Sequence, residues 1–445
     1  MKAKAIVLSI SLLTAMTVIG GGTNAVHTFT LDECIRIGMK RSATALNARR
    51  DQEIAGATVT RTRSEIFPQL SADGSYTRLD EIQSMDIGGQ AIEMGTLNNY
   101  SVDFKATQLL YSGGRLGAAI TASKLAKVYA EWELADVEAG LIRDIRTGFY
   151  DILLAKSMVA VKEESLQQIQ SMVDQTEQKF KNGRVSEFDL LSSRVRLANE
   201  KPELIRARNL LQLATESFKR IINVEDATFD VQGTLEFHAA TNSFDSLCRS
   251  ALLNRPSLRE METGVALREQ DMQAAKAPYY PTISSYFIYG GANSYRFISF
   301  DDEWQWRWTA GVTASWSLWD SGLTRSTVQM KQLEVDKAKT TLADTKKAIV
   351  LEIKQSYLDM QRAGETIEAG RGNVEMAGKA LSISKSRLDS GLATYLEFSD
   401  ANQALREAQF SLSLALRDYM AAAAKLRYAA GSVESLDHQA GDKYK

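Results

Sequence analysis

Apolar residues recur every three or four positions along two long, proline-free stretches of the chain. The first stretch covers about residues 112–181, and the second occupies the same place in the other half of the sequence. The recurring positions are Leu134, Val137, Leu141, Ile145, Phe149 and Ile152 in the first stretch and Leu342, Thr345, Ile349, Ile353, Tyr357 and Met360 in the second. Such a narrow stripe suits helices that pack against neighbouring helices. A helix of about 70 residues is ~105 Å long, so the pattern predicts a bundle, coiled coil or tube and not a compact globular domain.

The segments before these helices alternate with a period of two, as β-strands do. Strand pairs are predicted over residues 69–79 and 98–110, and over residues 282–291 and 304–318, each pair around a polar loop. The apolar members are Tyr100, Val102, Phe104 and Ala106 in the first pair and Trp304, Trp306, Trp308, Ala310, Val312 and Ala314 in the second. Alternation with aromatic residues near one end is typical of strands between lipid and water. A soluble hairpin with one wet face is the alternative interpretation.

The chain is an internal duplication. Residues 31–68 match residues 244–281 at an offset of 213, and from Leu110, which matches Leu318, the offset is 208. Each half has the same predicted order: a helix, a strand pair, a very long helix, a tight turn and a second long helix. The predicted organisation is a signal peptide over residues 1–25, a first repeat over 26–230, a second repeat over 231–430 and a C-terminal tail over 431–445.

The first 25 residues form a secretory signal pattern. Lys2 and Lys4 precede an apolar core over residues 6–19, and small residues up to Ala25 offer a cleavage site. No cysteine stands at that site, so lipidation is not expected. The formal net charge of −2 becomes −4 when both lysines leave with the signal, which argues against a nucleic-acid partner. The remaining chain contains no apolar run of about 18 residues, so no transmembrane helix is expected.

Candidate catalytic chemistry is sparse. His27, His238 and His438 are isolated from one another and have no metal-ligand spacing with the two cysteines. No nucleophile elbow, phosphate loop or zinc-protease motif occurs. Cys34 and Cys248 lie near equivalent places in the two repeats, where two small buried side chains are the favoured interpretation and a disulfide is the alternative. The sequence therefore predicts no enzyme, no cofactor and no metal site.

Several marks, in this order and spacing, resemble the TolC family of outer membrane efflux proteins over about residues 29–430. The marks are Asn254-Arg255-Pro256-Ser257-Leu258 before an Ala-rich helix, residues 277–281 before a strand, the Leu-aromatic-x-x-Gly junctions at Leu110 and Leu318, and Gly183 and Gly391 closing the helical hairpins. The combination, repeated in both halves, is what carries the resemblance.

The resemblance implies a mainly α fold with a membrane β-barrel portion. Long α-helical hairpins form a periplasmic tube, and four β-strands per protomer join a shared twelve-stranded barrel in a homotrimer. The implied location is the outer membrane of a Gram-negative bacterium, with the tube extending into the periplasm. The membrane-interface aromatics are then Tyr100, Phe104, Trp304, Trp306 and Trp308.

The implied function is an exit duct of a tripartite efflux or type I secretion system, which conducts substrates passively to the exterior. Its partners are outer-membrane lipid, a periplasmic adaptor (membrane fusion) protein and an inner-membrane transporter of the RND, ABC or MFS type. The alternative is a secreted structural coiled-coil spacer protein without channel activity. That alternative does not explain why aromatic strand pairs recur in both halves.

The resemblance places adaptor contacts at the tips of the two helical hairpins. The tip residues are Asn182, Gly183, Arg184 and Val185 in the first hairpin and Ser390, Gly391, Leu392 and Ala393 in the second. Glycine suits so tight a reversal because it tolerates a positive φ, although an ordinary interhelical turn needs glycine equally. Val185 and Leu392 are expected to be exposed apolar residues suited to a contact between helix tips.

A constriction just above the tips is the second implied region. Asp189 follows the first tip, and Glu397 and Asp400 follow the second, at the family's positions for acidic groups that narrow the closed entrance. Three copies would form rings of negative charge that favour cations. Solvated charges on a helix exterior are the alternative interpretation.

The closed-state latch of some family members is missing from this sequence. In those members a Tyr and an Arg beside the second tip bond to the acidic group of the first. Leu388 and Ala393 occupy these two places here. Arg184 and Arg387 are the candidates to replace the latch.

Overall fold

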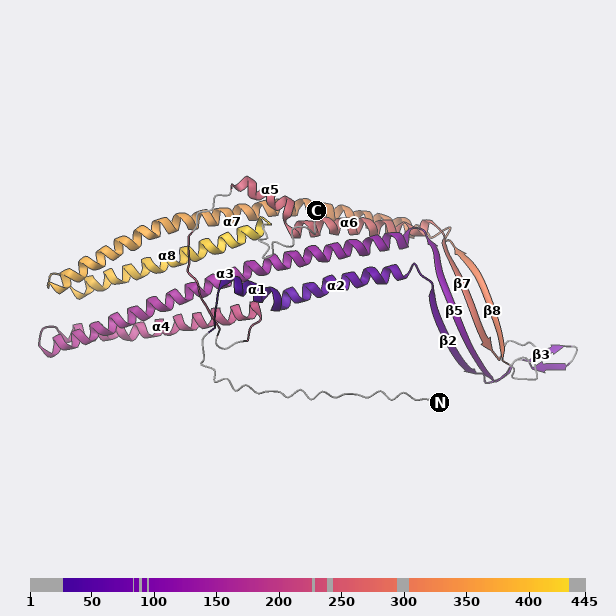
Figure 1. Cartoon of the computed structure of the whole chain (residues 1–445), viewed down its shortest axis with the longest axis horizontal. Helices are drawn as coiled ribbons and strands as arrows, with labels where there is room; N and C mark the ends of the chain where they lie inside the picture. Colours follow the sequence, from indigo (N-terminus) through magenta and orange to yellow (C-terminus); the bar gives the residue numbers. More distant parts are fainter. Residues whose placement is uncertain are drawn as a thin grey trace, which may run out of the picture.

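The computed structural model describes residues 27–82, 84–87, 90–93, 96–225, 229–237, 243–293 and 304–431. The expected signal peptide over residues 1–25 lies outside the described residues, as do the tail after Gly431, His238 and His438. Within the described ranges the molecule is elongated, with long helices along most of its length and a β-sheet at one end (Figure 1).

The same elements occur in the same order in both halves. The first half contains α1 (Leu31–Arg41), α2 (Ala43–Ser64), β2 (Gln69–Arg78), β5 (Asn98–Ser112), α3 (Arg115–Lys181) and α4 (Glu187–Ile222). The second half contains α5 (Phe244–Asn254), α6 (Pro256–Ala275), β7 (Thr282–Ala292), β8 (Gln305–Ser315), α7 (Leu323–Asp389) and α8 (Tyr395–Ala429). Two short strands, β1 (His27–Phe29) and β6 (Phe229–Val231), pair in parallel. The duplication is confirmed, and the repeat boundary at residue 230 stays a prediction.

The long helices α3 and α7 each contain 67 residues, which corresponds to ~100 Å. Each folds back at its C-terminal end into a shorter helix, α4 or α8, and both hairpins point to the end of the molecule opposite the sheet (Figure 1). The first long helix begins at Arg115, three residues after its predicted start at about residue 112, because β5 runs to Ser112 and a two-glycine turn follows.

A four-stranded antiparallel sheet joins the two halves. Its order is β2-β5-β7-β8, so the central β5–β7 pair connects the first half to the second, and β2 and β8 are the open edges. The predicted strand 304–318 is too long, because β8 ends at Ser315. A small hairpin of β3 (Ser84–Ile87) and β4 (Gln90–Glu93) projects beyond the sheet where only a loop was predicted (Figure 1).

Left-handed backbone marks both junctions between sheet and long helix. Gly113 and Gly114 have φ values of +61° and +87°, and their equivalents Ser321 and Gly322 have 55° and +86°. A Cβ at Gly113 would overlap the carbonyl group of Ala277, whereas a Cβ at Gly114 or Gly322 would meet nothing within 4 Å. Gly113 is therefore required by space as well as by conformation.

Each half has its own hydrophobic core in the helical part of the molecule. The predicted stripes supply buried residues to both cores: Leu141, Ile145, Phe149 and Ile152 in α3, and Ile349, Ile353 and Met360 in α7. In the first core, Gly38 of α1 lies against Ile145 of α3 and Ile222 of α4. The equivalent residues of the second core are Ala251, Ile353 and Ala430, all fully buried. The two cores therefore fill the same place with different side chains.

The two cysteines are free thiols, with Cys34 buried in α1 and Cys248 half-buried in α5. Burial raises the pKa of the Cys34 thiol to about 12, so its reactive thiolate is scarce and it acts as a core side chain. Among the helices that the structure describes, none has an apolar stretch long enough to cross a membrane.

Candidate functional site

The two hairpin tips share one turn geometry. In the first, the Gly183 amide donates to the Phe180 carbonyl at 2.8 Å and the Arg184 amide donates to Lys179 at 2.9 Å. The second tip repeats both bonds at the equivalent positions, with glycine again in the left-handed region. This bond pair with a glycine is the Schellman end of a helix. No atom lies within 4 Å of an added Cβ at Gly183 or Gly391, so conformation and not space requires glycine there.

The apolar residues exposed at the tips differ from the prediction. Leu392 is 71% exposed, as expected, but Val185 is half-buried. Phe188, in the first turn of α4, is 77% exposed, and its equivalent Leu396 in α8 is exposed as well. Both residues follow the helix N-cap by two positions. An apolar residue at this position in both repeats could have predicted the exposed side chains from the sequence. Each tip therefore presents a large apolar side chain to solvent.

Asp189 and Glu397 occupy the same position, the third residue of α4 and of α8. Asp189 accepts from the Ser186 hydroxyl at 2.6 Å and from the Ser186 amide at 3.1 Å, while its own amide donates to Ser186 Oγ. These bonds with the side chain and backbone of Ser186 lower the pKa of Asp189. Thr394 and Glu397 form two of the three corresponding contacts, each at 3.3 Å: the Glu397 amide donates to Thr394 Oγ1, and the Thr394 hydroxyl donates to the Glu397 carboxylate. Asp189 thus completes a capping box at the start of α4, whereas at the start of α8 the cap is the Thr394 side chain. The sequence analysis missed both local contacts.

The acidic residues of the predicted constriction are all exposed in the single chain. Asp400 lies one turn after Glu397 on α8, so these two carboxylates share a helix face. Arg387 donates to the Leu392 carbonyl at 3.3 Å. Within the described part of the chain, neither Arg184 nor Arg387 pairs with Asp189, so the replacement latch is not formed inside one chain.

A polar seam joins the two hairpins along their length, and it was not predicted. Helix α8 of the second half lies along α3 of the first. The seam is formed by Tyr428 with Asp136 at 3.3 Å, Arg417 with Asp151 at 2.6 Å, Ser413 with Ser157 at 3.2 Å, and Asn402 with Gln168 at 2.6 Å. Arg196 of α4 also donates to Ser399 of α8. Since these partners lie more than 200 residues apart, local pattern could not reveal them.

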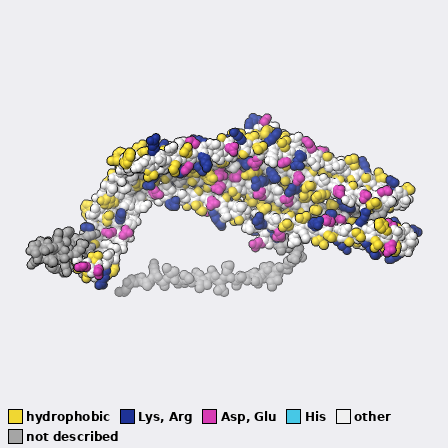
Figure 2. Space-filling view, turned by 180° about the vertical axis from the view of Figure 1, so that it is seen from behind, with side chains coloured by type: hydrophobic (Ala, Val, Ile, Leu, Met, Phe, Trp, Pro, Cys, Tyr) yellow, Lys and Arg dark blue, Asp and Glu magenta, His cyan; other side chains and the backbone are white. Residues whose placement is uncertain are grey.

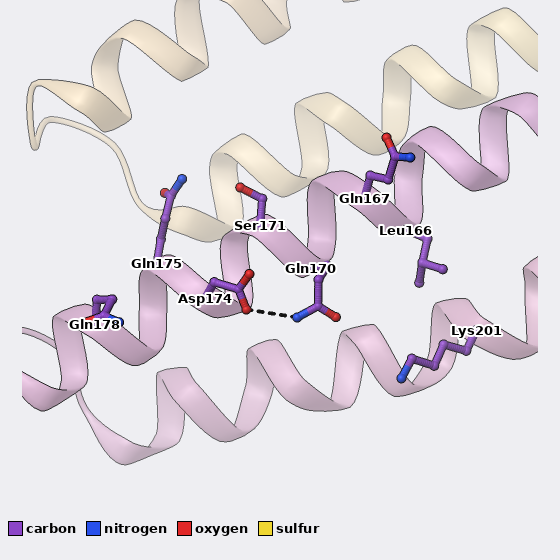
Figure 3. Close-up of a pocket in the computed structure, with 8 residues that line it drawn as sticks. All are labelled: Leu166, Gln167, Gln170, Ser171, Asp174, Gln175, Gln178 and Lys201. Carbon is purple, nitrogen blue, oxygen red and sulfur yellow. Dashed lines mark hydrogen bonds between the residues drawn. The ribbon is translucent and has the colours of Figure 1, made fainter.

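A groove of about 630 Å³ runs along the first hairpin near its tip. Half of its eight lining residues are glutamines of α3, namely Gln167, Gln170, Gln175 and Gln178; the others are Leu166, Ser171 and Asp174 of α3 and Lys201 of α4. Figure 3 shows Gln170 and Asp174 joined on the side of α3 that faces α4, with a bond of 3.0 Å. An open, amide-rich groove of this kind suits contact with another helix.

The sheet has one apolar face and one polar face. Residues directly opposite in antiparallel strands lie on the same side, and the register places Phe104 opposite Tyr289 and Tyr289 opposite Trp308. The aromatic pairs on this face are Tyr76 with Tyr100 at 5.0 Å, Tyr289 with Trp306 at 5.2 Å, and Phe287 with Trp308 at 6.4 Å between ring centroids. Trp304 lies just before β8 and contacts Trp306 edge-to-face at 6.0 Å.

The opposite face of the sheet is polar. The same register brings Asp73, Asp103 and Arg307 into one row across β2, β5, β7 and β8, with Gly290 between the last two. Figure 2 shows that charges of both signs are interspersed along the helices, while apolar side chains gather where the sheet meets them. The large aromatic side chains of the apolar face, among them Tyr100, Phe104 and Trp308, are exposed in the single chain.

Metal chemistry has no support in the described residues, where no group of three or more His, Cys, Asp and Glu side chains is placed to hold an ion. The features described above are therefore surfaces: two tips, a groove, a two-faced sheet and an acidic segment behind each tip. Such surfaces can contact partners, lipid or passing ions without making or breaking bonds.

Comparison with known proteins gives a consistent result. The model of the family described as "Outer membrane efflux protein" matches residues 39–224 and 247–432. The outer membrane protein TolC of Vibrio cholerae is 22% identical over 94% of both chains, and TolC of Escherichia coli is 22% identical over 87% of this chain and 79% of its own length. The Campylobacter jejuni CmeC outer membrane channel superposes with a TM-score of 0.78 at 17% identity, covering 90% of this chain and 85% of that one. The open state of the Neisseria gonorrhoeae MtrE outer membrane channel gives a TM-score of 0.74 at 14% identity, covering 90% and 88%.

Proposed function

Because the chain belongs to the outer membrane efflux protein family, we propose that it is the outer-membrane exit duct of a tripartite efflux or type I secretion system. The relatives and structural neighbours named above are channel proteins and not enzymes. The observation that carries the proposal is the two-faced sheet with two open edges, mounted at the end of two helical hairpins of ~100 Å.

In this proposal the aromatic face of the sheet lies against outer-membrane lipid. Tyr100, Phe104, Trp304, Trp306 and Trp308 anchor it at the interface. Open strand edges are not tolerated in hydrocarbon, because every backbone donor and acceptor must be paired there. The edges β2 and β8 therefore pair with those of two further copies, and the twelve strands of a homotrimer close on themselves with the polar face inward.

The helical hairpins form the part of the duct that reaches through the periplasm. The tips, with Phe188, Leu392 and Leu396 exposed, are the proposed contact for a periplasmic adaptor protein, because apolar side chains at helix ends suit a helix-tip contact. The adaptor in turn connects to an inner-membrane transporter of the RND, ABC or MFS type. Export through the cleaved signal over residues 1–25, without lipidation, brings the chain to this place.

The acidic segment behind the tips is the proposed constriction. Three copies of Asp189, Glu397 and Asp400 place negative charge around the duct entrance, which favours cations over anions. The capping bonds of Asp189 are compatible with this role, because a carboxylate that bonds to a helix start keeps its charge and further acceptor sites. The lowered pKa of Asp189 keeps it ionised at neutral pH.

The experiment is single-channel recording of the purified protein in a planar bilayer, with the oligomer mass measured in parallel. We expect a trimer that gives discrete, cation-preferring steps. The double variant Glu397→Gln with Asp400→Asn is expected to move the reversal potential in a salt gradient towards zero, because the preference for cations is reduced. Glu368→Gln, an exposed carboxylate on α7 away from the tips, is the matched control and leaves it unchanged.

Two results would contradict the proposal at different levels. An unchanged reversal potential in the double variant contradicts the assignment of the constriction but not the proposal that the chain is an exit duct. A water-soluble, elongated protein that never inserts into the bilayer contradicts the proposed duct and favours the coiled-coil spacer.

A further inference from the structure

One ion pair occupies equivalent positions in the two repeats. In the first, Arg49 of α2 bonds to Glu138 of α3 at 2.8 Å. In the second repeat, the offset of 213 takes Arg49 to Glu262 of α6, and the offset of 208 takes Glu138 to Lys346 of α7. These two residues bond at 3.2 Å. The charges are exchanged between the helices, but the contact is kept. The offsets of 213 and 208 therefore identify equivalent contact positions in the two repeats.

The contacts between the repeats have counterparts that one chain cannot make. Helix α3 packs on α6 and α8, and β5 pairs with β7. Exchange of the repeats turns these into contacts of α7 with α2 and α4, and of β8 with β2. Within the chain, α7 packs mainly on α8 and α6, and β8 and β2 are the sheet edges. All three missing contacts point to one occupant, the first repeat of a second copy.

The surfaces left open carry apolar residues where the intrachain seam is polar. Arg196 of α4 bonds to Ser399 of α8. The equivalent positions are Ala404 of α8 and Leu191 of α4, both exposed, the leucine to 52%. A polar contact inside the chain is thus replaced by a small and a large apolar residue whose burial would favour association.

Helix α7 shows the same replacement. Gln168 of α3 bonds to Asn402 at 2.6 Å, and its equivalent on α7 is Met376, which is 62% exposed. Arg143 of α3 stacks on an aromatic ring of α8, and its equivalent is Leu351, which is 68% exposed. Large apolar side chains uncovered along a helix mark a face that a partner covers.

At one pair of equivalent positions, the open faces of α4 and α7 carry opposite charges. Within the chain, Tyr428 of α8 bonds to Asp136 of α3 at 3.3 Å. The equivalents are Arg220 of α4 and Asp344 of α7, both exposed and without a partner among the described residues. Arginine opposite aspartate would make a stronger contact than the tyrosine–aspartate bond it mirrors.

We propose that α4 of one copy packs against α7 of the neighbouring copy in the register that joins α8 to α3 within the chain, so that Arg220 pairs with Asp344. The inference rests on the proposed homotrimer and names the surface that builds it. The contact is head-to-tail, since different surfaces meet, and such a contact closes into a ring when the rotation allows. In a ring of three copies, intrachain and interchain seams then alternate.

The test is a charge exchange in the full-length protein, read as the temperature at which the trimer dissociates in SDS. Arg220→Asp and Asp344→Arg each place like charges together and are expected to lower that temperature by several degrees. The double exchange restores the pair in reverse and is expected to recover most of the loss. The exchange between Arg49–Glu138 and Glu262–Lys346 shows that this fold tolerates such a reversal.

Cross-linking gives an independent readout. In a background of Cys34→Ala and Cys248→Ala, a short bismaleimide is expected to join Arg220→Cys to Asp344→Cys and yield covalent dimers and trimers. The control pair is Arg220→Cys with Lys379→Cys, whose second site lies about 50 Å further along α7 and outside the reach of the reagent.

The failures of the two proposals are distinguishable. If the wild type is a trimer and all three charge variants dissociate at the wild-type temperature, with cross-linking no higher than in the control, this interface is wrong and the proposed duct is unaffected. A wild-type chain that stays monomeric in detergent overturns both.

Discussion

The contact of Gly38 with Ile145 and Ile222 offers a sharp test of how the two cores are filled. A Cβ at Gly38 would overlap Ile145 Cδ1 and lie 3.4 Å from Ile222 Cγ2. The second core instead carries a methyl group on the short helix, at Ala251, and has alanine in place of Ile222 at the end of the long return helix, at Ala430. We therefore expect Gly38→Ala alone to overpack the first core and Gly38→Ala with Ile222→Ala to reproduce the second.

The magnitudes follow from burial. Overpacking costs about 1–3 kcal/mol, and the better helix propensity of alanine offsets about 0.5–1 kcal/mol of it, so Gly38→Ala should destabilise by roughly 1 kcal/mol. Ile222 is fully buried, and its truncation to alanine should cost about 2–5 kcal/mol. The new methyl group fills part of that cavity. The double variant should therefore lose about 1–2 kcal/mol less stability than the sum of the losses in the two single variants.

The assay is urea unfolding of the refolded protein in detergent, followed by helical circular dichroism, for the wild type, both single variants and the double variant. Gly56→Ala is the matched control, because Gly56 is also helical but its added Cβ would meet no atom within 4 Å. It should gain about 0.5–1 kcal/mol. The reasoning is refuted if Gly38→Ala is as stable as Gly56→Ala, or if the double variant shows no favourable coupling.

Three further predictions concern the junction, the pH dependence and the tips. Gly113→Ala should impair folding more than Gly322→Ala, since both strain a positive φ but only the first overlaps a backbone carbonyl; equal yields and equal melting temperatures would contradict this. Burial raises the pKa of Glu260 above 4.5, so the folded chain loses stability as pH rises from there through the folded-state pKa. Glu260 of α6 accepts a hydrogen bond from the Tyr129 hydroxyl of α3, and Glu260→Gln keeps an acceptor for it. This variant should therefore be more stable than wild type near pH 7 and no better near pH 4, and equal melting temperatures at both pH values would refute the assignment. Gly391→Pro cannot adopt a φ of +74°, so it should weaken binding of the adaptor to the trimer while assembly, measured by mass, persists; loss of the trimer would count against the tip assignment.

Most of the secondary structure was readable because periodicity is local. The helical stripe and the two-residue alternation each depend on neighbours within a few positions, and α3, α7 and the four sheet strands lie within a few residues of the predicted segments. Some errors are missed elements: the β3–β4 hairpin was predicted as a loop, and the single helix expected before each strand pair is two helices. The other errors fall at element ends. The helix expected from about residue 112 starts at Arg115, and the strand expected to residue 318 stops at Ser315. The glycine and serine turns there are dictated by the meeting of sheet and helix.

The candidate site was only partly readable from sequence. The tip glycines and the acidic positions were found by spacing, and the structure shows both tips closing in the same way. The contacts of Asp189 with Ser186 and of Glu397 with Thr394 were within reach, because Ser and Thr stand three residues before the two acidic residues. The half-burial of Val185 was not, since it depends on how the chain folds back over itself.

The sequence by itself determined the duplication, the kinds of element and the residues at the turns, because these are properties of short stretches and of one half compared with the other. Only the tertiary structure decided which elements meet. The β5–β7 pairing, the packing of α3 on α6 and α8, and the seam of Arg417 with Asp151 join residues far apart in the chain. Such contacts are selected by complementary shape and charge among many possible pairings, and no local period encodes that choice.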